Sequence, residues 1–173
     1  GTYNEETGKY EIEVKNTGKN LLNLPDGTYT HNGITAVISN GIITINGTST
    51  ATSFITIPIN LELESNFSIS LNNTAMGDSL SEVRLQITGS NFRSVSLSVA
   101  NNKRENISNC GTYTSFLIRI SSGVTITNGI IKPQVELGSI ERTDFQEYIE
   151  PQKIDLYELN DKSYVTANLD KND

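Results

Sequence analysis

The stretch ITAVISNGIITING, residues 34–47, decides the fold class. Its two halves, ITAVIS (34–39) and GIITING (41–47), belong to a set of short runs in which apolar and polar residues alternate, as they do in half-buried β-strands. Asn40-Gly41 separates the halves, and Asn-Gly readily supplies the positive φ angles of a tight hairpin turn. The stretch therefore predicts two antiparallel strands joined by a short turn.

Alternating runs of this kind recur along most of the chain, about 8–12 residues apart, which favours a sandwich or jelly roll over a βαβ fold. Pro58 interrupts one of them and suggests an edge strand or a bulge there. No convincing helical stripe appears. We therefore expect an all-β protein, an antiparallel β-sandwich of jelly-roll type. The other runs expected to form strands are 9–15, 53–59, 66–71, 82–88, 94–100, 115–121, 123–127 and 129–137.

The composition excludes several kinds of site. The 173 residues carry 13 Lys and Arg against 20 Asp and Glu, a net charge of −7, which disfavours nucleic acid as a partner. No apolar run approaches the roughly 20 residues of a membrane-spanning helix, so no membrane insertion is expected. The single Cys110 excludes an internal disulfide, and the single His31 is the one histidine available to a catalytic triad. We expect no signal peptide in this fragment.

The chain changes character after Pro151. Residues 151–173 are polar and charged, with one short strand expected at 154–159 and then a tail that links to a following module. The strand at 154–159 is a candidate partner for the run at 9–15, which would bring the two ends of the domain side by side. The sequence thus divides into a β-sandwich module, residues 1–150, and a C-terminal segment.

The stretch IIKPQVELGS, residues 130–139, predicts a strand with one buried and one wet face. Pro133 cannot donate a hydrogen bond to a neighbouring strand, so the strand is irregular or at an edge there. The buried parity is expected to comprise Ile131, Pro133, Val135 and Leu137. The wet parity is expected to comprise Ile130, Lys132, Gln134 and Glu136.

Four segments in order carry a resemblance to a known family: GKNLLNL (18–24), NGIITINGTSTATSFITI (40–57), IKPQVELGS (131–139) and TDFQEY (143–148). Together they resemble the carbohydrate-binding-module-like jelly-roll domains of phage and prophage tail, baseplate and receptor-binding proteins. The resemblance covers roughly residues 9–159. One departure is Glu147, where related sequences often carry Pro.

This resemblance implies a galactose-binding-like sandwich that recognises host cell-surface glycans and catalyses no reaction. It implies a place in the virion tail or outside the cell, with cell-surface carbohydrate and other tail or baseplate subunits as partners. A homotrimer of the full-length protein is the arrangement common among tail-tip proteins. Calcium occurs in many related sandwiches, but no dense run of Asp and Asn ligands is visible in this sequence, and no cofactor is expected.

Strand parity offers one candidate ligand surface. If the apolar residues of 82–88 and 115–121 face inward, then Arg84, Gln86 and Arg119 face outward. If these strands share a sheet, the three side chains line one solvent-facing surface, with serines between them at Ser96 and Ser98. A polar groove for a glycan or an anionic polymer is the functional interpretation, and an ordinary solvated sheet face is the alternative.

A second candidate is the segment LPDGTYTHNG, residues 24–33, interpreted as a loop at one end of the sandwich. It would gather four residues, Asp26, Tyr29, His31 and Asn32. Binding residues often lie on such loops. Asp26-Gly27 also fits a simple turn. Tryptophan is absent, so tyrosines are the aromatic platforms considered for sugar rings: Tyr3, Tyr10, Tyr29, Tyr113, Tyr148, Tyr157 and Tyr164.

An enzyme has little support in the sequence. A glycosidase would need two placed carboxylates, and nothing marks a pair among the 20 acidic residues. No glycine-rich phosphate loop, serine elbow or metal-ligand spacing appears. Two non-catalytic alternatives stay open beside a glycan-binding module. One is a structural spacer of a tail fibre, and the other is a binding module attached to a cell-wall hydrolase.

Overall fold

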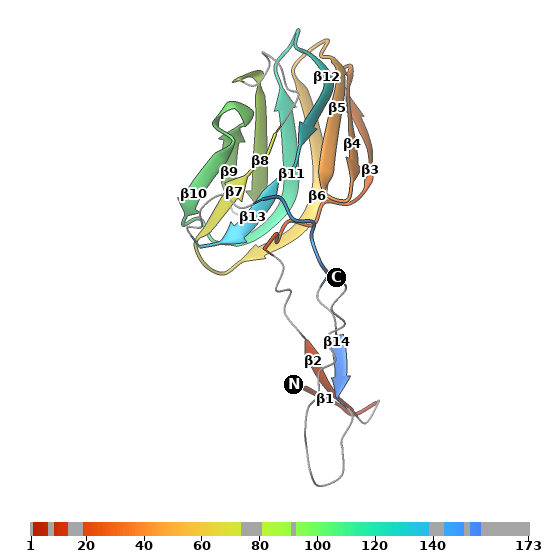
Figure 1. Ribbon diagram of the computed structural model, residues 1–173, viewed down its shortest axis with the longest axis vertical. Helices are drawn as coiled ribbons and strands as arrows, with labels where there is room; N and C mark the ends of the chain where they lie inside the picture. Colours follow the sequence, from red (N-terminus) through yellow and green to blue (C-terminus); the bar gives the residue numbers. More distant parts are fainter. Residues whose placement is uncertain are drawn as a thin grey trace. The chain divides into compact units, whose positions relative to one another are not determined.

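A computed structural model describes residues 2–6, 9–13, 19–73, 81–90, 93–138, 144–150 and 153–156. The chain divides into two compact units, one of residues 1–17 with 150–173 and one of residues 18–149. Antiparallel β-strands make up most of the described residues of both units, and the described ranges contain no α-helix (Figure 1). The expected all-β class is confirmed.

The first sheet of the larger unit has four antiparallel strands in the order β6-β11-β8-β9. Its strands are β6 (Ser53–Leu63), β11 (Gly111–Ile120), β8 (Val83–Gly89) and β9 (Ser94–Ser98). In the centre of the sheet Ile118 lies opposite Ile55 on one side and Leu85 on the other. The register shifts between Tyr113 and Ser115, where β11 is irregular against both neighbours.

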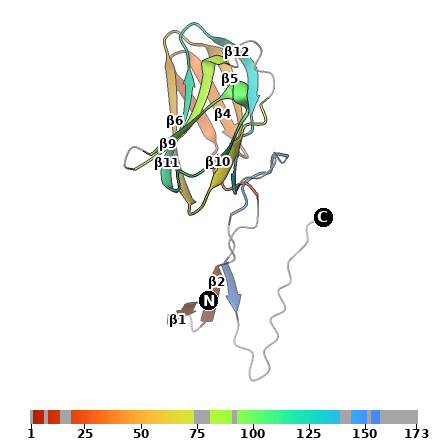
Figure 2. The same ribbon diagram turned by 90° about the vertical axis from the view of Figure 1, so that its left-hand side faces the viewer.

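Two further sheets lie against this one (Figures 1 and 2). One has the order β12-β5-β4-β3, with β12 (Thr125–Ile131), β5 (Ile42–Thr48), β4 (Ile34–Ser39) and β3 (Gly27–His31). The other has the order β10-β7-β13, with β10 (Lys103–Ile107), β7 (Phe67–Ser70) and β13 (Gln134–Leu137).

Lys132 and Pro133 separate β12 from β13 within one extended run. Pro133 lacks the N–H that a continuous ladder would need, so the pairing changes from β5 to β7 at this point. The Lys132 N–H donates to the Leu71 carbonyl at 2.8 Å and begins the new pairing. The second and third sheets are thus joined by one chain segment, and the architecture is sandwich-like.

Branched aliphatic side chains fill the space between the sheets. Strand β6 alternates as expected: Ile55 and Ile57 are buried, whereas Phe54 and Thr56 are exposed. Each fully buried side chain of this size contributes about 1.5–3 kcal/mol relative to an exposed one. The largest fully buried side chains are Tyr113, Phe67, Leu22, Ile34, Ile38, Ile43, Ile45, Ile57, Leu63, Leu71, Ile118 and Ile120.

The hairpin predicted from residues 34–47 is confirmed. Ser39 pairs with Ile42, and Asn40 and Gly41 adopt φ angles of 50° and 73° between them. Two strands of the larger unit, β3 and β10, were missed by the sequence patterns. The segment 24–33 is therefore not a loop, because residues 27–31 pair along their length with β4.

The expected parity of residues 130–139 is wrong at three positions. Gln134 is 0% exposed and Glu136 is 4% exposed, although both were assigned to the wet face. Leu137, assigned to the core, is 45% exposed. The side chain of Gln134 is enclosed because its Oε1 accepts a hydrogen bond from the Gln146 N–H at 2.7 Å. The segment at 144–150 thus contacts the face that was expected to be wet.

Asn20, close to the N-terminal end of the larger unit, contacts the region around Gln134 and Gln146. Its side chain is 1% exposed. Its Oδ1 accepts hydrogen bonds from the N–H groups of Leu22 at 3.0 Å and Val135 at 3.1 Å. Its Nδ2 donates to the carbonyls of Gln146 at 3.0 Å and Pro133 at 3.4 Å. These five residues, the Asn20 junction, bring together three of the four segments that carried the family resemblance.

The smaller unit contains a three-stranded antiparallel sheet in the order β1-β2-β14. Its strands are β1 (Thr2–Asn4), β2 (Lys9–Glu13) and β14 (Lys153–Leu156). The pairing of β14 with β2 confirms the partner expected for the C-terminal strand, with Ile154 opposite Ile12. Strand β2 belongs to this unit, whereas the sequence pattern placed 9–15 at the start of the sandwich. Residues 14–15 and 157–159 lie outside the described ranges.

Candidate functional site

The outward face of the sheet β6-β11-β8-β9 carries the first set of candidate residues. Strand register places four side chains in one row across the sheet: Phe54, Arg119, Arg84 and Ser98. The next row is formed by Thr56, Leu117, Gln86 and Ser96. The row from Phe54 to Ser98 is called the Phe54 row below.

The expectation that Arg84, Gln86 and Arg119 share one solvent-facing surface is confirmed as a placement. Arg84 is exposed, and Gln86 and Arg119 are partly exposed, while the alternate residues of β8 and β11 are buried. The serines differ from the expectation: Ser96 and Ser98 lie on the edge strand β9, beside the three residues rather than between them.

The two arginines of the Phe54 row are direct neighbours. Arg119 lies opposite Arg84 in the antiparallel register, which sets their Cα atoms about 4.5–5.5 Å apart. Like charges directly opposite each other destabilise a sheet. Within the described part of the chain, the one ion pair is between Lys103 and Glu105 at 2.8 Å. Neither arginine is neutralised by a described carboxylate, so the row carries local positive charge on an acidic protein.

Gln86 retains hydrogen-bonding capacity toward solvent. Its Nε2 donates to the Thr88 Oγ1 at 3.1 Å, which orients the amide along β8. An amide group has two N–H donors and a carbonyl acceptor, so one donor and the acceptor stay available. This arrangement suits recognition of a hydroxyl group, which both donates and accepts.

Phe54 is the residue of this face that sequence reasoning missed. It is 46% exposed and lies opposite Arg119. The search for aromatic platforms considered tyrosines alone. The signal was present, however, because Phe54 has the opposite parity to the buried Ile55 and Ile57 in an alternating run.

The second candidate set does not form one site. Asp26 precedes β3 and His31 ends it, so they lie at opposite ends of a five-residue strand, roughly 15 Å apart. The Asp26 Oδ1 accepts a hydrogen bond from the Asn40 N–H at 2.8 Å and so supports the turn between β4 and β5. Tyr29 packs against the core, and its hydroxyl donates to the Pro25 carbonyl at 3.5 Å.

His31 instead lies beside the Phe54 row. Its Nδ1 accepts a hydrogen bond from the Phe54 N–H at 3.1 Å. The Ser53 hydroxyl donates to the His31 carbonyl at 3.0 Å. These contacts join the end of β3 to the start of β6, and they hold the backbone of Phe54 in place.

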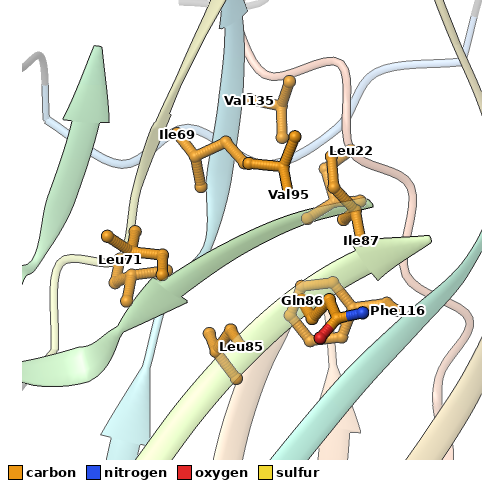
Figure 3. Close-up of a pocket in the computed structure, with 10 residues that line it drawn as sticks. Leu22, Ile69, Leu71, Leu85, Gln86, Ile87, Val95, Phe116 and Val135 are labelled. Carbon is orange, nitrogen blue, oxygen red and sulfur yellow. The ribbon is translucent and has the colours of Figure 1, made fainter. Parts of the chain in front are cut away.

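A small cavity lies in the core between this sheet and the sheet β10-β7-β13, and Gln86 is among the residues that line it (Figure 3). Its volume is about 10 Å³, and side chains of facing strands line it, among them Leu71, Leu85 and Val135. A space of this size and apolar character is a packing void, because even one water molecule needs polar partners. It offers no room for a ligand.

Two kinds of feature are absent from the described residues, a cluster of metal-ligating side chains and a membrane-spanning helix. No group of three or more His, Cys, Asp and Glu side chains there could hold a metal ion. No helix in that part of the chain combines the length and the hydropathy that crossing a bilayer requires.

Comparison with known proteins identifies no relative: no family model, no curated protein and no solved structure matches the chain. The function must therefore be argued from the Phe54 row and its surroundings.

Proposed function

We propose that this chain is a non-catalytic carbohydrate-binding module with a jelly-roll, galactose-binding-like fold. Its ligand face is the outward side of the sheet β6-β11-β8-β9. The observation that carries the proposal is the Phe54 row, in which an exposed aromatic ring and two arginines without a described ion-pair partner follow one another across three strands.

The chemistry of this face matches what a sugar requires. The ring of Phe54 offers an apolar surface for the C–H face of a sugar. Arg119, Arg84 and Gln86 offer donors and an acceptor for hydroxyl groups. A rigid sheet presents these groups in fixed positions, which lowers the entropic cost of binding.

The resemblance to phage and prophage tail modules gives this proposal its biological setting. The glycan would belong to a host cell surface, and the module would work in a virion tail together with other tail or baseplate subunits. A module attached to a cell-wall hydrolase would use the same face on a similar ligand.

A structural spacer is the second candidate, and one observation favours it. The cavity described above lies in the core and is too small for a ligand. A spacer would tolerate substitutions on this face with no effect on any ligand.

A glycan array and a host-cell pull-down with the full chain separate these two functions. Replacing Phe54 by Ala should weaken glycan binding about tenfold, since a buried aromatic anchor typically contributes one or more kcal/mol to an interface. Val37→Ala is the matched control, because Val37 is 42% exposed on β4 in another sheet. Binding that survives Phe54→Ala, or no binding by the unmodified chain, contradicts the proposal.

A further inference from the structure

We propose that the Phe54 row selects an acidic glycan, one whose sugar carries a carboxylate or phosphate group. This inference rests on the proposed carbohydrate-binding function and specifies its ligand class. The sugar ring lies on Phe54, and its acidic group lies at the guanidinium groups of Arg119 and Arg84.

The spacing of the row supports this arrangement. Phe54, Arg119 and Arg84 occupy three adjacent strands, so neighbouring positions are about 4.8 Å apart. A ligand that covers Phe54 therefore reaches Arg119 one strand away, and its next unit reaches Arg84. Guanidinium groups bind carboxylate and phosphate through paired N–H donors, a geometry that uncharged hydroxyls use less well.

The charge of the row is the second argument. Two arginines opposite each other repel, and the fold gains nothing from them without a counter-charge. A bound anion removes this repulsion between the two arginines. The loss of the repulsion therefore adds to the free energy that favours the bound state. The attraction of anions is a local property of the Phe54 row, because the molecule as a whole has a net charge of −7 and repels polyanions.

Nearby carboxylates define where the acidic group can bind. Glu82 lies just before β8, two residues from Arg84, and it forms no ion pair with either arginine among the described residues. It repels an anion at that end of β8. Glu62 is exposed on β6 eight residues beyond Phe54, roughly 26 Å along the strand. The favourable position is therefore between Arg119 and Arg84.

The test measures binding of the full chain to a matched set of polymers by calorimetry. Polygalacturonate supplies the carboxylate, and its methyl ester has the same backbone without the charge. Phosphomannan supplies the phosphate on a sugar ring. Polyglutamate supplies carboxylates without sugar rings. We expect binding of polygalacturonate or phosphomannan that weakens as salt is raised, and at least tenfold weaker binding of the methyl ester and of polyglutamate.

Variants assign the effect to the row. Arg84→Gln and Arg119→Gln should each weaken binding of the acidic glycan about tenfold or more, because each loses a charge-assisted hydrogen bond. Lys19→Gln is the control, since it removes one positive charge from an exposed residue outside this sheet. It should change the affinity less than twofold. Urea midpoints of all three variants that are no lower than that of the unmodified chain verify that they fold.

The outcomes separate this inference from the proposed function. Equal binding of polygalacturonate and its methyl ester overturns the inference and leaves a carbohydrate-binding module. Equal binding of polyglutamate also overturns it, because charge alone would then explain the affinity. An unmodified chain that binds none of these polymers and no glycan on the array overturns both.

Discussion

Replacing Asn20 by Ala should be among the most destabilising single substitutions in this protein. The side chain is buried and makes four hydrogen bonds, to Leu22, Val135, Gln146 and Pro133. Alanine would leave two N–H donors and two carbonyl acceptors without these partners. The substitution removes few apolar contacts, so its cost reports on the hydrogen bonds.

The expected loss follows from the burial of the partners. Leu22 and Val135 are 1% and 0% exposed, so their N–H groups cannot turn to water. A buried donor without a partner costs about 1–3 kcal/mol. The 3.4 Å contact with Pro133 is long, and Gln146 is exposed, so the two carbonyls add less. The sum is about 3–5 kcal/mol, a large part of a typical stability of about 5–15 kcal/mol.

Urea unfolding, followed by circular dichroism, measures this loss. For an m-value of about 2 kcal/mol/M, the midpoint should fall by roughly 2 M. Asn60→Ala is the matched control, because Asn60 is an exposed residue of β6, and it should change the free energy of unfolding by less than about 0.5 kcal/mol. A fall of less than about 0.5 M for Asn20→Ala would show that the junction does not hold the segments of Asn20, Val135 and Gln146 together.

Three further perturbations test the fold elsewhere. Gly47→Ala should lower the free energy of unfolding by about 2 kcal/mol or more, because φ is 122° and a Cβ would lie 2.1 Å from the Gly33 carbonyl oxygen. Urea midpoints measure this loss. Gly123→Ala is the control with the smaller expected loss, because φ is 81° there but no atom lies within 4 Å of the added Cβ. Burial raises the pKa of Tyr113. Since an unfolded tyrosine ionises near pH 10, this contribution to stability should be complete below about pH 10 and be lost as the pH rises further. The urea midpoint should therefore fall between about pH 8 and pH 11, and it should fall less for Tyr113→Phe than for the unmodified chain. Residues 18–149 expressed alone should unfold in one cooperative transition with a midpoint close to that of the full chain, since they form a compact unit of their own; loss of that transition would contradict the division.

In the larger unit, the strands that the sequence revealed are those with a buried face, and the missed ones are at sheet edges. Residues 34–47 were predictable because alternation and the Asn-Gly turn agree. Strand β3 has no fully buried residue, and in β10 only Ile107 is buried. An edge strand with a solvated surface lacks the periodic apolar signal, so its composition resembles that of a loop.

The candidate face was partly predictable for the same reason. Parity within β8 and β11 placed Arg84 and Arg119 outward, and the sheet then made them neighbours. Sequence could not show that they lie directly opposite each other, because register between strands depends on the whole sheet. It also could not show that Gln134 is buried, because the segment that contacts it lies beyond the strand itself.

The family resemblance covers only part of the candidate site, since Phe54 belongs to the segment 40–57 whereas the two arginines do not belong to any of the four segments. The position of the arginines has a physical reason. Asn20, Val135 and Gln146 belong to three of the resembling segments, and they meet at a junction of buried hydrogen bonds. Arg84 and Arg119 lie outside all four segments. A junction whose loss costs several kcal/mol tolerates few sequences, whereas an exposed sheet face tolerates many. The sequence around the Asn20 junction therefore reports on the scaffold, and the ligand is inferred from the face of β6, β11 and β8.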